Sequence, residues 1–286
     1  MANHLIVKHN DEFYVLGDNT NGQLGIYGLK NANVLTKINK KGLENVYYAG
    51  NYSILKVNND AIIYDKFSIF NKFSIMKNVK DILLCEDYFF ITNNLNCLYA
   101  YGENRHGQLG TCTNDNLFKP EHIKISGLKK IYSNDSATFI ITDEGLFATG
   151  KNNYGQLGLN IINSINIFSK INFKHNVNNI YTKHDHTFLD SDDGLYACGK
   201  NTFGELGLGH VNNTRQFEKV NINLPITKIE CGTVFTLLLS GDVLYCAGSN
   251  LNGLLGQQYF DSTHEFTPFC FNIDTFDDIY EKDEFK

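Results

Sequence analysis

Short apolar runs separated by tight-turn residues recur along most of the chain. Residues 139–141 and 237–239 are runs of Phe, Ile and Leu that are followed closely by the turn sequences DEG and SGD. The runs at 146–148 and 195–197 begin directly after turns of this kind. β-Branched, aromatic and leucine residues on both sides of a tight turn predict β-hairpins.

Two further strands are predicted around each hairpin. One precedes it, as at 229–230, and the other follows it, as at 168–173 and 217–222. Four short strands in a unit of about 49 residues is the spacing of one blade of a β-propeller. The pattern therefore predicts an all-β fold built from repeated four-stranded sheets.

A nine-residue pattern, G-x-N/S-x-x-G-x-L-G, punctuates these units. It begins at Gly17, Gly102, Gly150 and Gly199, and in a looser form at Gly248; the last four starts are 48, 49 and 49 residues apart. We interpret these glycines as structural, because they permit positive φ and close backbone approach, while the Asn side chain can hold the turn. The eighth position is Leu in every copy, and we expect it to be buried: Leu24, Leu109, Leu157, Leu206 and Leu255.

The 85 residues between the first two motifs leave room for one more unit. Residues 46–65 repeat the hairpin pattern, but no glycine motif follows them, so the second repeat, at about 46–81, is interpreted as degenerate. Residues from His4 to Gly17 resemble the closing half of a unit, and 269–280 resemble an opening half. We expect the two termini to complete one blade, which removes exposed sheet edges. The prediction is one domain, 1–280, forming a closed β-propeller of about six blades, or seven, with a short acidic tail at 281–286.

Composition and charge exclude several other classes of protein. The net charge is −6, of which residues 274–286 carry −4, and no basic cluster exceeds a pair of lysines. Nucleic-acid binders usually present a basic face, so we expect no direct nucleic-acid binding. We also expect no secretory signal, no membrane span and no disulfides, since the seven cysteines form no CxxC pair. These features favour a monomeric protein of the cytoplasm or the nucleus.

The residues His184, Asp185 and His186 are the one group that suggests a metal site. On a strand the two histidines would share one face, but two ligands are too few for zinc without a third. His186 also occupies the position of Ala137 and Phe235 in neighbouring repeats, so we expect it to pack inside. Without a nucleophile elbow, a paired-carboxylate motif or a dinucleotide fingerprint, we predict no catalytic residue, no cofactor, no metal site and no enzyme.

The strand G-x-L-Y/F-x-x-G leading into G-x-N-x-x-G-Q-L-G resembles the repeat of the regulator of chromosome condensation family, over about residues 4–280. The resemblance implies a propeller, commonly of seven blades. The founding member of the family is a nucleotide exchange factor for the small GTPase Ran, and it uses an inserted β-wedge. No inserted wedge is visible here, because no spacing between the regular motifs exceeds 49 residues.

The resemblance favours a protein–protein interaction scaffold, and the alternative is a guanine-nucleotide exchange factor for a small Ran-like GTPase. The partner is expected to be another protein, with a small GTPase as one candidate. Loops on a propeller are free to vary, and aromatic and Arg side chains are preferred interface anchors. The candidate partner-contact residues are Arg105, His106, Tyr154, Lys183, His184, Phe203 and Arg215.

Overall fold

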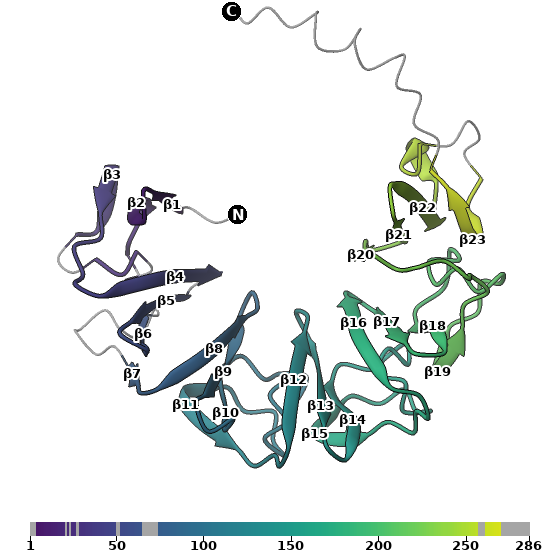
Figure 1. Cartoon of the computed structure of the whole chain (residues 1–286), viewed down its shortest axis with the longest axis horizontal. Helices are drawn as coiled ribbons and strands as arrows, with labels where there is room; N and C mark the ends of the chain where they lie inside the picture. The colour runs from purple at the N-terminus through teal and green to yellow at the C-terminus, as the bar shows by residue number, and fades with distance from the viewer. Residues whose placement is uncertain are drawn as a thin grey trace, which may run out of the picture. The chain divides into compact units, whose positions relative to one another are not determined.

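The computed structural model describes residues 4–269, apart from 21, 23, 27–28, 50–51, 65–73 and 257–260. The chain forms two compact units, Met1–Lys151 with Ser164–Lys170 and Asn152–Asn163 with Ile171–Lys286. Every sheet in the described part consists of strands that follow one another in the chain and pair antiparallel with their neighbours (Figure 1). The predicted all-β fold is confirmed. The prediction of a single domain at 1–280 stays a prediction.

The first unit holds four sheets among its described residues. They are β1 (His4–His9), β2 (Glu12–Asp18) and β3 (Asn31–Lys37); β4 (Leu43–Ala49), β5 (Tyr52–Val57), β6 (Asp60–Tyr64) and β7 (Ser74–Met76); β8 (Val79–Leu84), β9 (Tyr88–Asn93), β10 (Leu98–Gly102) and β11 (Leu117–Ile123); and β12 (Leu128–Ser133), β13 (Ala137–Thr142), β14 (Gly145–Gly150) and β15 (Ile165–Lys170).

The second unit holds two sheets among its described residues. They are β16 (Val177–Lys183), β17 (His186–Ser191), β18 (Gly194–Gly199) and β19 (Thr214–Lys219); and β20 (Lys228–Cys231), β21 (Phe235–Ser240), β22 (Val243–Gly248) and β23 (Thr263–Pro268). A short 3-10 helix, η2 (Leu251–Gly253), lies between β22 and β23.

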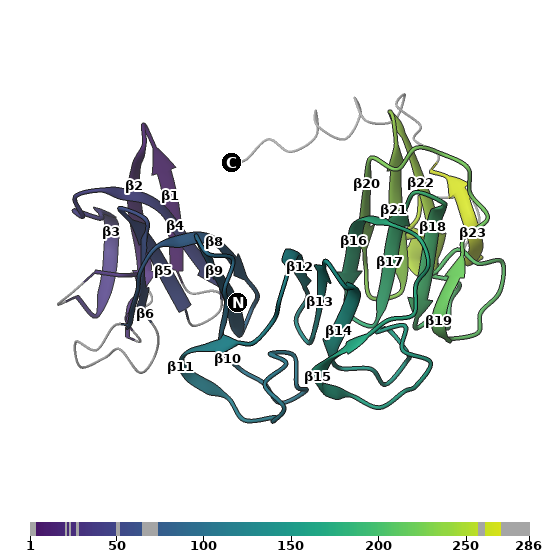
Figure 2. The same cartoon turned by 60° about the horizontal axis from the view of Figure 1, so that its bottom comes forward.

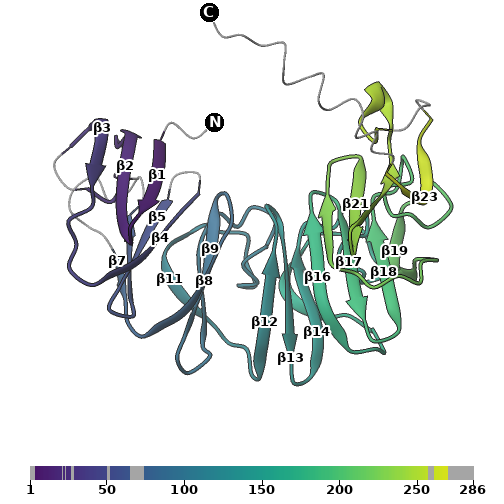
Figure 3. The same cartoon turned by 45° about the horizontal axis from the view of Figure 1, so that its top comes forward.

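Neighbouring sheets within a unit stack face to face. In the first unit β4 lies beside β8, and β8 beside β12, so the first strands of successive sheets are neighbours (Figure 3). In the second unit β16 lies beside β20, and Figure 2 shows the two sheets stacked. The middle strands are therefore covered on both faces, which explains why they are nearly continuous apolar runs rather than alternating ones. Phe188, Leu206 and Leu238 belong to the core between the two sheets of the second unit.

The degenerate second repeat still forms a complete sheet. Strands β4 to β7 pair in order, although β7 has only three residues. The region of the expected loop deletion, 65–73, lies outside the described residues. Four strands thus form without a glycine motif, since hairpin pairing and burial of Ile54, Leu55 and Ile63 require none.

The first sheet has three described strands. His4 of β1 pairs with Gly17, as Ala137 of β13 pairs with Gly150, so β1 takes the place of a second strand. No described residue takes the first-strand place in this sheet. The segment 269–280 was expected there, and all of it except Phe269 lies outside the described residues. Completion of this blade by the two termini stays a prediction.

This prediction has a direct test. Deleting residues 274–286 removes most of the expected strand and leaves β1 as an open edge, so we expect a lower melting temperature. A protein of this size loses about 2–4 °C for each kcal/mol of stability. The matched control removes only 281–286, and we expect it to melt like the full chain. Equal melting temperatures for both truncations and the full chain would contradict completion by the C-terminal segment.

Candidate interaction surface

The nine-residue motifs form loops that directly follow the third strand of five sheets, and we call them the motif loops (17–25, 102–110, 150–158, 199–207 and 248–256). One hydrogen bond is common to all five. The side-chain carbonyl oxygen of the motif Asn accepts the backbone N–H of the Leu five residues later. These N–H to Oδ1 distances are 2.8 Å for Asn19–Leu24, 2.9 Å for Asn104–Leu109, Asn152–Leu157 and Asn201–Leu206, and 2.8 Å for Asn250–Leu255.

The motif leucines fill the space beneath these loops. All five have no exposed surface: Leu24, Leu109, Leu157, Leu206 and Leu255. The first glycine of each motif has φ between 108° and 111°, a conformation that side-chain-bearing residues rarely adopt. At Gly150 a Cβ would also overlap the carbonyl oxygen of Ser136. The motif loops are therefore tied to the sheets by both backbone geometry and packing.

A second side chain fixes the tip of three motif loops. The side-chain oxygens of Gln108, Gln156 and Glu205 accept the N–H of the residue two positions earlier, at 3.0, 3.0 and 2.7 Å. These three side chains are buried. Each loop thus has a fixed internal frame, and the fourth and fifth motif positions project from it.

The projecting side chains differ from loop to loop. Arg105 is 64% exposed, and Leu251, in the same position of the last motif loop, is 61% exposed. His106, Tyr154 and Phe203 are half-buried. Leu251 was not among the predicted contact residues, although its place in the motif, identical to that of Arg105, is a signal that could have found it.

The turn between the first and second strands lies beside the motif loop in both units. The N–H of Glu103 donates to the carbonyl of Asp87 at 2.9 Å, and that of Lys200 donates to Asp185 at 2.9 Å. The amide of Gln156 donates to the Asp185 carboxylate at 3.1 Å. The turn that carries Lys183 and His184 is therefore next to motif loop 150–158.

The electrostatic character of these loops differs between repeats. In motif loop 102–110 the Arg105 guanidinium binds the Glu103 carboxylate. Partial burial and the neighbouring charges of Glu103 and Glu86 raise the pKa of Asp87. In motif loop 199–207 the position of Glu103 is taken by Lys200, whose ammonium lies 5.9 Å from the centroid of the Phe203 ring.

The structure corrects the expectation that Arg215 lies in a loop. It lies on strand β19, where it is exposed, and not in a loop. Its position still matters, because a Cβ on Gly155 would be 2.6 Å from the Arg215 Cα. In the second unit, motif loop 150–158 thus touches both β19 at Arg215 and the turn of Lys183 and His184. Arg105 and His106 belong to the first unit.

The structure also corrects the expectation that His184 and His186 lie on one face of a strand. His184 lies in the turn with φ of 52°, so it does not share a strand face with His186. His186 is fully buried, as expected, and its Nε2 is 3.2 Å from Thr236 Oγ1. Burial, with a smaller effect of His184, lowers the pKa of His186 to about 3. Within the described residues no group of three His, Cys, Asp or Glu side chains could hold a metal ion.

The described part of the chain contains no helix long and apolar enough to cross a membrane.

Comparisons with known proteins agree with this geometry. The model of the regulator of chromosome condensation (RCC1) repeat matches residues 96–133 and 192–239. The human X-linked retinitis pigmentosa GTPase regulator is 34% identical over 107 residues, which are 36% of this chain and 10% of the relative. The mouse protein of that name is 33% identical over 108 residues, covering 36% of this chain and 11% of the relative. The match therefore spans about a tenth of these relatives.

Solved structures resemble the whole described chain more broadly. Yeast RCC1 (Prp20), in its complex with Kap60, has a TM-score of 0.68 and 16% identity, over 94% of this chain and 73% of that chain. Human WBSCR16 has a TM-score of 0.66 and 14% identity, over 91% and 76%. At such identities the likeness concerns the fold, and it confirms a β-propeller.

Burial of the motif leucines predicts a large effect of truncating one. We expect Leu157→Ala to lower the free energy of unfolding by about 2–5 kcal/mol, since it removes buried methyl groups and leaves a cavity. Urea denaturation measures this loss. The control is Leu95→Ala, because Leu95 is 82% exposed. A stability equal to that of the control variant would show that the motif Leu is not part of the core.

The buried His186 predicts a loss of stability in acid. Its pKa is about 3 in the folded protein and about 6.5 when unfolded, so only the unfolded chain gains a proton between these values. The contribution of neutral His186 is complete above pH 6.5 and is lost as the pH falls toward 3. We expect about 2 kcal/mol of this loss between pH 7 and pH 5. Denaturant melts at both pH values should show a smaller loss for His186→Gln and an unchanged loss for His184→Gln. Equal losses in all three proteins would contradict the prediction.

Proposed function

We propose that this chain, whose residues 96–133 and 192–239 match the regulator of chromosome condensation repeat, is a protein-interaction scaffold whose motif loops contact the partner. The observation that carries the proposal is the common frame of these loops. The same hydrogen bond from the Leu N–H to the Asn side-chain oxygen and the same buried Leu hold every motif loop, whereas the side chains at the tip differ.

A fixed frame with variable tips suits protein recognition. Loops held by their own hydrogen bonds lose little conformational freedom on binding, so the contacts they make contribute more fully to affinity. The tips offer Arg105 in the first unit and Tyr154 and Phe203 in the second, and Arg and aromatic side chains are preferred in protein interfaces. Leu251 adds an exposed apolar side chain in the second unit.

Regulation of a small GTPase is the second candidate function. The human relative is named a GTPase regulator, and the Saccharomyces cerevisiae protein Prp20p was described with its binding properties to Gsp1p and histones. Nucleotide exchange requires a surface that displaces nucleotide and metal from the GTPase. In the second unit the polar turn of Lys183 and His184, beside motif loop 150–158, is the surface that would do so.

Affinity capture with the tagged full chain, from a lysate of cells that express it, distinguishes the two functions. We expect specific proteins to be retained whether or not EDTA is present, and we expect Tyr154→Ala with Phe203→Ala to reduce their recovery about tenfold. Recovery of a small GTPase that increases with EDTA would support exchange, because exchange factors prefer the nucleotide-free state.

The control variant for this capture is Leu95→Ala, which removes an exposed apolar side chain from the β9–β10 turn. It should retain the partners. If the control and the loop variant behave alike, or if the full chain retains nothing specific, the motif loops are not the contact surface.

A further inference from the structure

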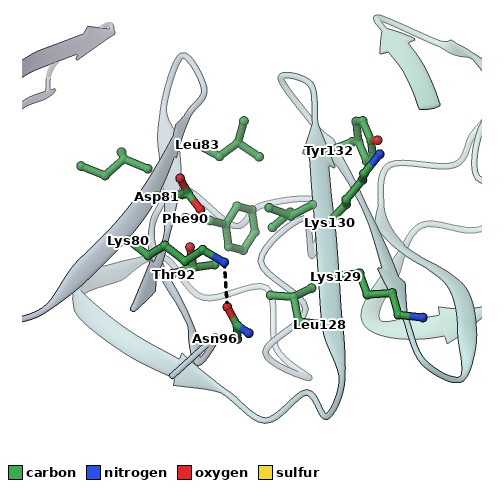
Figure 4. A pocket seen from close by; sticks show the side chains of 12 residues that line it. Lys80, Asp81, Leu83, Phe90, Thr92, Asn96, Leu128, Lys129, Lys130 and Tyr132 are labelled. Atoms are coloured by element: carbon green, nitrogen blue, oxygen red, sulfur yellow. Dashed lines mark hydrogen bonds between the residues drawn. The ribbon is translucent and has the colours of Figure 1, made fainter. Parts of the chain in front are cut away.

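A groove lies between the third and fourth sheets of the first unit. Its walls are the first strands β8 and β12, and it encloses about 390 Å³ (Figure 4). That volume is near the lower end for ligand pockets, so it suits one or two side chains of a bound segment.

The interior of the groove is apolar with one polar group. Figure 4 shows Leu83, Phe90 and Leu128 around it, and Ile131 completes the lining. The Thr92 hydroxyl also lines the groove and is buried without a hydrogen-bond partner. An unsatisfied buried hydroxyl costs free energy, so a ligand group that accepts its proton would be favoured.

The rim of the groove is basic. Three lysines, Lys80, Lys129 and Lys130, line it against one carboxylate, Asp81. Lys80 reaches across to the Asn96 side chain at 3.0 Å, and Lys129 pairs with Asp143 at 3.0 Å. The net charge of the whole chain is −6, so the groove is a local positive site on an acidic protein, and it is complementary to an acidic ligand.

The repeats themselves show that the fold does not require these lysines. The inward Ile of the first strand recurs as Ile82, Ile131, Ile180 and Ile229. The two residues before it are Lys80-Asp81 and Lys129-Lys130 here, but Asn178-Asn179 and Thr227-Lys228 in the second unit. The Thr92 position is taken there by Asp190, whose pKa is raised by burial. The equivalent surface in the second unit therefore has one lysine, Lys228, where the groove has three, and Lys228 pairs with Glu230 at 2.7 Å.

We propose that this groove binds an acidic peptide segment of a partner protein. One large apolar side chain of the peptide lies among Phe90, Leu128 and Ile131. Its carboxylates lie at Lys80 and Lys130, and a peptide carbonyl accepts the hydrogen bond of the Thr92 hydroxyl. The proposal rests on the proposed scaffold function, to which it adds a second, chemically defined contact site.

Fluorescence anisotropy with the full chain tests the proposal. The probe is a fluorescein-labelled eight-residue peptide with a central Phe flanked by two Asp residues on each side. We expect saturable binding with a Kd on the order of micromolar for so small a contact. Replacing the Phe by Ser, or the Asp residues by Lys, should each weaken binding at least about tenfold.

Matched variants locate the site. Lys80→Glu and Lys130→Glu should each weaken peptide binding about tenfold, and far-UV circular dichroism should confirm their fold. Lys228→Glu is the control, because Lys228 occupies the Lys130 position in the last repeat and is also exposed. It should bind the probe like the unaltered chain.

Several results would overturn the groove assignment. These are no binding of the probe, equal weakening by all three variants, or displacement of the probe by free glutamate at concentrations that act on any anion site. The affinity capture described above gives an independent readout. Partners retained there without peptide binding here reject the groove alone, whereas loss of the loop-dependent capture rejects the scaffold.

Discussion

In four of the sheets, the close approach between the end of the third strand and the turn of the preceding hairpin is the contact on which the other features depend. At Gly150 the N–H of the next residue, Lys151, donates to the Ser136 carbonyl at 2.8 Å, and the missing Cβ makes room for that carbonyl. The same bond joins Ser249 to Val234. It turns the chain out of the sheet, shifts the register of the fourth strand at the glycine, and places motif loops 102–110, 150–158, 199–207 and 248–256 beside a hairpin turn.

Stability and surface chemistry are consequently separated within one short segment. A single sheet cannot bury both of its faces, so neighbouring sheets and the motif Leu must cover them. The first, third, sixth, eighth and ninth positions of the motif, which are Gly, Asn, Gly, Leu and Gly, shape the motif loop and cover the sheet. The side chains of the fourth and fifth positions project from this frame, and they are as different as those of Arg105 and Phe203. Each motif loop is thus a small, fixed surface whose tip side chains differ from those of the other motif loops.

The repeat made much of this structure predictable. The hairpins, the four strands of most repeats and the burial of the five motif leucines and His186 follow from local pattern alone. Two expectations were wrong for local reasons. The strand ends at Lys183, where a tight turn with positive φ begins at His184, and β19 starts at Thr214, one residue before Arg215. The groove of the first unit was not predicted, because Lys80 and Lys130 come together only through packing of two sheets. The pair Lys129-Lys130 was visible in the sequence, but nothing in the sequence placed it opposite Thr92.

Motif loop 199–207 has Glu205 at the position where motif loop 150–158 has Gln156, and the hairpin turn next to each loop also differs. The amide of Gln156 donates to Asp185 in the adjacent turn. One repeat later the position of Asp185 is taken by Val234, so an amide in the equivalent place would have no carboxylate to donate to. Glu205 occupies the equivalent place. One of its carboxylate oxygens accepts the Phe203 N–H, and the other, Oε1, is buried without a hydrogen-bond partner. The Gln156–Asp185 hydrogen bond thus joins motif loop 150–158 directly to the adjacent hairpin turn. A surface built from motif loops therefore includes these turns, and residues on both must be considered together when its partner is sought.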